Sequence, residues 1–329
     1  MGGWFSKSDW LDKCAEDDHN DSRCTSLNVI RISVGLLSFF CSAFMIFIIW
    51  AFKRYLFFSQ RLLLFLSIAG MLDTLPYIMG SVESDIKCKI QGYLMTYFDW
   101  VCVGWISVIT ANIYRLVKHE KSYESQEMLF HLVCWFLPLI IAGIPLLTDS
   151  YGHSGPWCWI KGDTPWDNVM RFLVWYGPVL VIVISLTAIL VYLRIHTKRE
   201  RDTWSGYSPE EENAKWKKWK EVRILFLYPI VFICISFFPL ITRIHMALNT
   251  QSNFVLVLLT SITAPLLGTA NTLLYSCGAE MRAQIRPKAL WEELRHRRHR
   301  TEGENYPVID DDFNEATRER DEDIMPYDQ

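Results

Sequence analysis

Residues 132–159, LVCWFLPLIIAGIPLLTDSYGHSGPWCW, decide the fold of this chain. The stretch opens as an apolar run of about 20 residues, which is long enough to cross a bilayer as a helix. It then turns polar and glycine-rich and ends with Cys158 between Trp157 and Trp159. Tryptophans are typical of the membrane–water interface, and a cysteine there favours a disulfide if the loop faces an oxidising compartment. The stretch therefore predicts a membrane span, an outer loop and a tether to another helix.

Further long apolar runs recur along the 329 residues, of which 51% are hydrophobic. Repeated runs of this kind indicate a polytopic membrane protein, whereas a soluble chain of this length would form one or two domains. The predicted fold class is an all-α membrane protein, a bundle of seven transmembrane helices. The expected spans are 29–52, 62–82, 88–117, 128–147, 169–193, 222–248 and 252–276.

The basic residues set the expected orientation. The loops on one side of the membrane, together with the segment after the last span, carry 22 Lys or Arg, and the opposite side carries six. Positive charge marks the cytoplasmic side, so we expect a multi-pass plasma-membrane protein with an extracellular N-terminus and a cytoplasmic C-terminus. This orientation favours glycosylation of the sequon at Asn20 over myristoylation of Gly2.

The topology predicts an extracellular N-terminus, a seven-span domain, an amphipathic juxtamembrane helix on anionic lipid and a disordered acidic cytoplasmic tail. In that order, their expected boundaries are 1–28, 29–277, 278–300 and 301–329. Cys277, at the start of the juxtamembrane segment, is either a palmitoylation site or a free thiol. Cys14 and Cys24 both lie on the outer side, where two remaining cysteines usually pair.

Short motifs lie in order along six of the seven expected helices and in the outer loop between two of them. They are RLLLFLSIAG, IYRLVKHEK, LFHLVCWFLPLI, PWCWI, YGP, LYPIVF, TRIHMALN and NTLLY. Together they resemble the cyclic-AMP-receptor-like (class E) G-protein-coupled receptors. The chain departs from that pattern at Gly70, where family members often carry Asp, and at Thr242, where the family has Asn. A retinal pump is disfavoured because the last span contains no lysine.

The resemblance implies a receptor that transmits an extracellular signal to a heterotrimeric G protein, with a cyclic nucleotide or another anionic small molecule as the candidate ligand. It also implies a disulfide between Cys88 and Cys158, and a G-protein docking place at Arg115, Lys118 and His119. We expect no enzymatic activity, cofactor, metal or nucleic-acid partner, because the chain has no phosphate-binding glycine loop and its eight histidines are scattered without metal-ligand spacing.

Ionisable side chains inside a membrane span are costly and usually functional, and three of those in the expected spans are singled out here. From the helical rise, Asp73 and Asp99 are expected at similar depth on neighbouring helices, with Arg243 nearer the outer end of its helix. Arg243 can bind a phosphate or carboxylate through its planar fork; alternatively, it reaches the headgroups or pairs with Asp99. Three outer-loop residues either cap this pocket or, in the case of the two tryptophans, anchor the loop at the interface. They are Trp157, Trp159 and Lys161.

Two expected helices carry candidate switch residues. Asn271 and Tyr275 lie near the inner end of the last span, where a polar amide needs a partner in the bundle. Pro229 and Pro239 are expected to kink the sixth span. The hypothesis is that ligand contact favours a state in which the inner half of that span swings outward. Two alternatives remain open: a transporter or channel with intramembrane Asp and Arg lining a path, and a ligand-independent scaffold.

Overall fold

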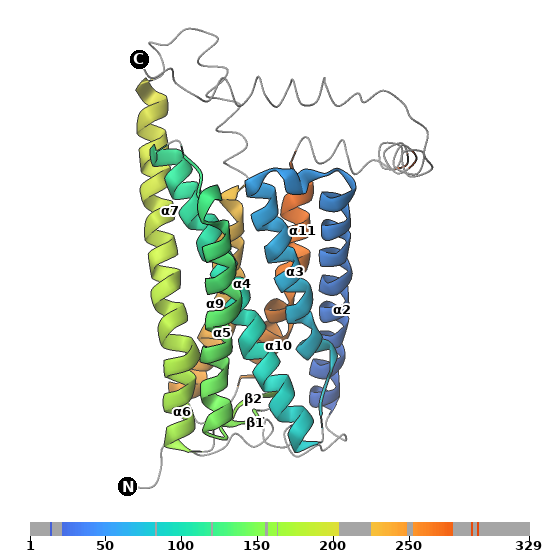
Figure 1. Ribbon diagram of the computed structural model, residues 1–329. Helices are drawn as coiled ribbons and strands as arrows, with labels where there is room; N and C mark the ends of the chain where they lie inside the picture. Colours follow the sequence, from blue (N-terminus) through green and yellow to red (C-terminus); the bar gives the residue numbers. More distant parts are fainter. Residues whose placement is uncertain are drawn as a thin grey trace. The chain divides into compact units, whose positions relative to one another are not determined.

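The computed structural model describes residues 14, 22–82, 84–119, 121–154, 157–162, 164–203, 225–248, 253–278, 291 and 295. Within these residues, seven helical segments are long and apolar enough to cross a membrane, so the predicted seven-helix fold is confirmed (Figure 1). In chain order they are α2 (Ser22–Ala51), α3 (Phe58–Ile78), α4 (Asp85–His119), α5 (Glu127–Leu147), α6 with α7 (Pro165–Arg171 and Gly177–Thr203), α9 (Leu227–Leu248), and α10 with α11 (Phe254–Thr263 and Leu267–Ser276).

Several predicted features lie outside the described residues. They are the sequon at Asn20, the basic run at 215–223, the juxtamembrane segment at 278–300 apart from Gly278, Trp291 and Arg295, and the tail at 301–329. The chain divides into a unit Met1–Arg282 and a unit Ala283–Gln329. All structural statements below concern the first unit.

The helix α4 is the centre of the bundle. In an apolar stretch of 18 residues within its span, 61% of the residues are buried, compared with 22% in the corresponding stretches of α5 and α9. It contacts α3, α5, α7 and α9. The outer helices instead expose apolar side chains, such as Phe136 and Ile140 on α5, as expected of helices that face lipid. The central helix α4 therefore connects the two ends of the bundle through its middle.

Prolines explain the irregular helix geometry. Pro265 lies in the 3-10 turn Ala264–Leu266, which separates α10 from α11. The helix is interrupted there because proline cannot donate a helical hydrogen bond. Pro239 lies inside α9. Pro229 is the third residue of α9, which begins at Leu227. A turn at Phe226 separates α9 from the helical Leu225, and the kink at Pro229 stays a prediction.

The first and last spans touch at Gly268. A Cβ atom there would lie 2.7 Å from the Ser38 hydroxyl oxygen, so only glycine fits. The same hydroxyl accepts a hydrogen bond from the Thr269 N–H at 3.1 Å. The Thr272 hydroxyl donates to the carbonyl oxygen of Cys41 at 2.9 Å. Small residues with interhelical hydrogen bonds are typical of membrane helix contacts, and here they hold α11 against α2.

A β-hairpin covers the end of the bundle at which α2 and α4 begin (Figure 1). Strand β1 (Tyr151–His153) pairs antiparallel with β2 (Cys158–Ile160). One disulfide joins Cys158 to Cys88 in the first turn of α4, and another joins Cys14 to Cys24 near the start of α2. Both cysteine pairs expected from the sequence are therefore formed, on the same side of the bundle.

Candidate functional site

The buried side chain of Gln91 holds the hairpin to two helices. Its Nε2 donates to the carbonyl oxygens of Pro76 at 2.7 Å and Gly80 at 2.8 Å, beside the end of α3. Its Oε1 accepts from the Cys158 N–H at 3.2 Å. A fully satisfied buried amide of this kind makes the hairpin position specific. The sequence alone does not single out Gln91, because a buried glutamine looks like an exposed one.

The hairpin places two tryptophans against the bundle. Trp159 is only 5% exposed, and its Nε1 donates to the Thr96 hydroxyl at 3.0 Å. Arg243, from α9, lies over both indole rings, with its Cζ 5.2 Å from the ring centre of Trp159 and 5.7 Å from that of Trp157. A cation over an aromatic face is electrostatically favourable. The structure thus places Trp159 inside the protein, where it does not act as an interface anchor.

The carboxyl groups of Asp73 on α3 and Asp99 on α4 interact directly. Asp73 is 3% exposed, and its Oδ1 has no hydrogen-bond partner. The two acids are therefore neighbours, as their expected depths indicated. Among the described residues Arg243 lies over the tryptophans instead of pairing with Asp99, so the cation and the acids form two separate groups.

Lys161, a predicted cap of the pocket, belongs to a surface ion cluster. Its Nζ donates to the Asp149 carbonyl at 3.1 Å and lies 4.0 Å from the Asp149 carboxylate. Lys89 approaches the same carboxylate at 2.7 Å. The structure therefore separates the role of Lys161 from that of Arg243. The reason is the turn after α5, where Asp149 has a positive φ of 51°.

Two arginines beside the hairpin are not among the residues singled out from the sequence. Arg171 donates through Nε to the Ile160 carbonyl at 2.9 Å and through Nη2 to the Ser154 hydroxyl at 2.8 Å. Arg31 on α2 is 2% exposed. Each arginine interrupts an apolar run, and that interruption is the signal that identifies both.

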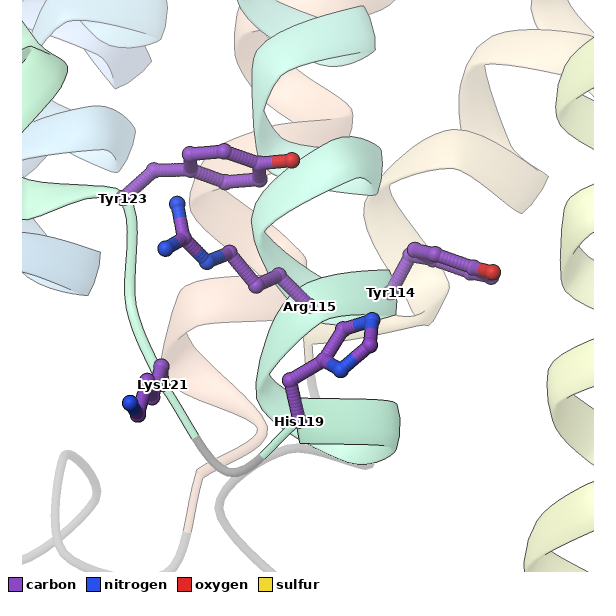
Figure 2. Close-up of a pocket in the computed structure, with 5 residues that line it drawn as sticks. All are labelled: Tyr114, Arg115, His119, Lys121 and Tyr123. Atoms are coloured by element: carbon purple, nitrogen blue, oxygen red, sulfur yellow. The ribbon is translucent and has the colours of Figure 1, made fainter.

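A cavity of about 490 Å³ lies at the other end of the bundle, near the end of α4 (Figure 2). Its lining residues are Tyr114, Arg115, His119, Lys121 and Tyr123. The guanidinium carbon of Arg115 lies 4.3 Å from the ring centre of Tyr123. None of the five lining residues is acidic, so the cavity suits an electronegative partner.

The structure brings two of the three predicted docking residues, Arg115 and His119, into this cavity. Lys118 is not a lining residue. Its Nζ donates to the Tyr114 hydroxyl at 3.0 Å and lies 6.0 Å from the ring centre of Tyr192 on α7. Lys118 therefore connects α4 with α7 beside the cavity.

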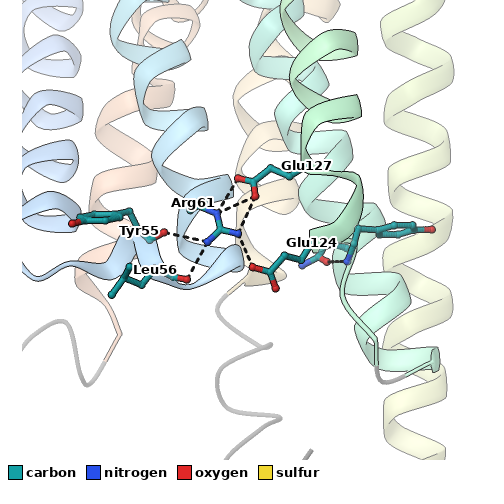
Figure 3. Close-up of polar contacts among 7 residues, drawn as sticks. Tyr55, Leu56, Arg61, Glu124 and Glu127 are labelled. Atoms are coloured by element: carbon teal, nitrogen blue, oxygen red, sulfur yellow. Dashed lines mark hydrogen bonds and ion pairs between the residues drawn. The ribbon is translucent and has the colours of Figure 1, made fainter. Parts of the chain in front are cut away.

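An ion cluster fixes the loop that carries Tyr123 (Figure 3). Arg61, in the first turn of α3, contacts the carboxylates of Glu124 at 2.7 Å and Glu127 at 2.9 Å. From the other side, the buried Asn112 of α4 accepts the Tyr123 N–H through its Oδ1 at 3.1 Å. The loop is thereby attached to α3, α4 and α5.

Comparison with known proteins decides the family. The family model described as slime mold cyclic AMP receptor matches residues 24–273. The chain belongs to this family. The receptor is 26% identical over 268 residues to "G-protein coupled receptor 1" of Arabidopsis thaliana, covering 79% of this chain and 80% of that protein. It is 30% identical over 176 residues to "Cyclic AMP receptor 1" of Dictyostelium discoideum, covering 51% of this chain and 41% of that protein.

The fold of the receptor is similar to the crystal structure of squid rhodopsin. The TM-score is 0.65 at 14% sequence identity, covering 84% of this chain and 88% of the rhodopsin chain. At that identity the likeness concerns the fold alone. Family and fold together are those of a multi-pass G-protein-coupled receptor.

Among the described residues, several buried polar side chains of α9 and α11 lack hydrogen-bond partners. Asn271 is 1% exposed, and neither its Oδ1 nor its Nδ2 is paired. The hydroxyl groups of Tyr275 on α11 and Tyr228 on α9 are also unpaired. Buried polar groups without partners are costly, so this arrangement leaves room for a second one that pairs them. Tyr228 stands in the motif LYPIVF, although the sequence gives it no role.

In the part of the receptor that the structure describes, one group of metal-ligand residue types comes together. The donor atoms of Cys88, His153 and Cys158 lie within 4.8 Å of one another. The two sulfurs are joined in a disulfide, and a metal needs the free thiolate. The group therefore reflects the hairpin register and does not form a metal centre.

The surface ion cluster gives the receptor a specific acid sensitivity. The hydrogen bond from Lys89, with the charges of Lys161 and Lys89, holds the pKa of the Asp149 carboxyl below its ordinary value. A lowered folded-state pKa contributes stability above the unfolded-state pKa of about 3.9 and loses it as the pH falls through the folded value. Below about pH 4, the unfolding temperature of Asp149→Asn is expected to depend less on pH than that of the unmodified receptor. Near neutrality the two unfolding temperatures are expected to have the same pH dependence. Thermal unfolding between acid and neutral pH checks this, and equal slopes at acid pH contradict it.

Proposed function

We propose that this receptor carries the signal of an extracellular anionic small molecule, with a cyclic nucleotide as the first candidate, to a heterotrimeric G protein. The observation that carries the ligand class is Arg243, which stacks on Trp157 and Trp159 without a carboxylate partner among the described residues. A guanidinium group in this state can bind a phosphate or carboxylate through two parallel hydrogen bonds. The relative named cyclic AMP receptor 1 supports a cyclic nucleotide. Asp73 and Asp99 contribute polar groups deeper in the same half of the bundle.

The proposed orientation places the hairpin end outside the cell and the C-terminus in the cytoplasm. It is supported by the 22 basic residues on one side against six on the other. The two disulfides at the hairpin end also support it, because disulfides persist in oxidising compartments. In this orientation Asn20 is open to glycosylation, and the exposed Cys277 at the end of α11 is a palmitoylation site.

The proposed G-protein contact is the basic cavity that contains Arg115 and His119. Coupling between the two ends runs through the switch residues Asn271, Tyr275 and Pro239. When ligand binds near Arg243, the part of α9 on the cytoplasmic side of Pro239 moves outward, and the unpaired groups of α11 gain partners. A ligand shifts this equilibrium only by its differential affinity for the two states.

Nucleotide exchange on purified G proteins tests this function. The receptor in lipid discs is expected to accelerate exchange more strongly with cyclic AMP than without it. Arg243→Ala is expected to raise the half-maximal concentration roughly tenfold or more, because a charge-assisted hydrogen bond contributes about 1.5–3 kcal/mol. Lys87→Ala removes an exposed outer charge and serves as the control.

Three other outcomes have distinct meanings. Nucleotide exchange that does not depend on cyclic nucleotides contradicts the proposed ligand but still supports a receptor function. Absence of exchange from folded protein, together with substrate flux in vesicles that contain only this chain, replaces the receptor by a transporter. Equal effects of Arg243→Ala and Lys87→Ala remove Arg243 from the ligand site.

A further inference from the structure

Arg31 on α2 is a buried cation that has no anionic partner among the described residues. Its side chain is 2% exposed. Nη2 donates to the Oδ1 of Asn28 at 3.1 Å, whereas Nε and Nη1 have no hydrogen-bond partner. None of the ion pairs among the described residues includes Arg31. A buried charge without a counter-charge is strongly unfavourable, so its presence in the first span calls for a function.

Trp157 connects Arg31 with Arg243. The guanidinium carbon of each arginine lies 5.7 Å from the centre of the Trp157 ring, so the two carbons are separated by no more than twice that distance. The ring face attracts both cations, but it offers their N–H groups no oxygen acceptor. Arg171, the third arginine beside the hairpin, differs from Arg31 because its Nε and Nη2 are both hydrogen-bonded. Nη1 of Arg243 donates to the sulfur of Met246 at 3.7 Å.

The buried acids of α3 and α4 do not neutralise Arg31 by contact. Asp73 and Asp99 interact with each other. Tyr77 is the residue that interacts with both the acid pair and Arg31. Two guanidinium groups from α2 and α9 therefore meet at one indole ring, at the end of the bundle that the hairpin covers.

We propose that Arg31 and Arg243 form an anion clamp, and that Trp157 occupies this clamp until a phosphate or carboxylate group enters it. The inference rests on the proposed ligand function of the hairpin end and adds to it a residue from the first span. An oxyanion that replaces the indole ring gives Nε and Nη1 of Arg31 the charge-assisted hydrogen bonds that they lack. The oxyanion belongs either to a soluble ligand or to a phospholipid headgroup.

The test is the anion-dependent thermal stability of the full chain in a maltoside detergent that contains neither phosphate nor lipid. One arm adds inorganic phosphate or cyclic AMP, and the other adds phosphatidylserine to the micelles, each compared with chloride at equal ionic strength. A rise in unfolding temperature that depends on Arg31 supports the clamp, and the arm in which it occurs identifies the source. No rise in either arm overturns the proposal.

Variants separate a binding role from a structural one. Arg31→Gln is expected to unfold without probe at the same temperature as the unmodified protein or higher, because an unpaired buried charge is removed. It is also expected to weaken the apparent affinity for the probe roughly tenfold or more. Lys87→Gln removes an exposed charge and is expected to change neither quantity.

Trp157→Ala keeps the proposal testable if Arg31→Gln does not fold. Removing the ring that occupies the clamp is expected to tighten binding of the probe. Weaker binding by Trp157→Ala, or unchanged binding by a folded Arg31→Gln, overturns the clamp. No G protein is present in these measurements, so their failure leaves the nucleotide-exchange result of the proposed function untouched.

Discussion

A receptor in which Cys88 and Cys158 are both replaced by serine is expected to lose its ligand response and to be destabilised by about 2–5 kcal/mol. The disulfide joins residues 70 positions apart, and the entropy that a cross-link removes from the unfolded chain grows with loop length. The bond also ties β2 to α4, and β2 carries Trp159 beneath Arg243. Loss of the tie therefore weakens both the fold and the ligand end.

Thermal unfolding and ligand-stimulated nucleotide exchange measure the two effects separately. The control is Cys234→Ser, which changes an exposed free cysteine of α9 and is expected to preserve both. Gln91 still links the hairpin to α3 and α4 in the double variant, so part of the hairpin structure should persist. A double variant with a full ligand response would show that the hairpin is not needed at the ligand end.

The second large effect is expected for Asn271→Leu, which should stabilise the receptor and reduce its signalling. The buried amide of Asn271 has two unpaired polar groups, and removing such groups in favour of an apolar side chain of similar size is expected to gain about 1–3 kcal/mol. The same change removes the groups that pair in the proposed second state. Maximal exchange is therefore expected to fall about tenfold or more.

Asn168→Leu, at an asparagine of α6 that is not fully buried, is the matched control. Unfolding temperature and maximal exchange rate are measured on both variants at saturating ligand. The switch hypothesis predicts opposite signs for the two quantities in Asn271→Leu. A fall in both would instead mean that Asn271 stabilises the fold, and the hypothesis would be rejected.

The seven helices could be predicted from the sequence because only a helix satisfies its own backbone inside a bilayer. Their ends could not. The helix α2 begins at Ser22, although the apolar run begins near Val29, because a helix can include polar residues that precede its apolar run. For α9 the expected start lies near residue 222, whereas α9 begins at Leu227, two residues before Pro229.

The positions of candidate site residues could be predicted from the sequence where they depend only on depth along a helix. The helical rise placed Asp73 and Asp99 at one level, and they are neighbours in the structure. Lys161 was assigned to the pocket because it follows Trp159 in the loop, but the turn at Asp149 directs it into the surface ion cluster. Arg31 was recognisable as a charge inside an apolar run, whereas its lack of a partner depends on packing that no local pattern reveals.

The loop that carries Tyr123 divides its end of the receptor into a fixed part, formed by α3, α4 and α5, and a movable part, formed by α9. Arg61 joins the loop to α3 and α5, and Asn112 joins it to α4, so we expect these three helix ends to move together. The helix α9 has few buried residues and contains Pro239. We therefore expect α9 to move more easily than the helix ends that the loop joins. Substitutions in the joined ends of α3, α4 and α5 should therefore alter how well the helix bundle folds. Substitutions along α9 should instead alter how readily this helix moves outward.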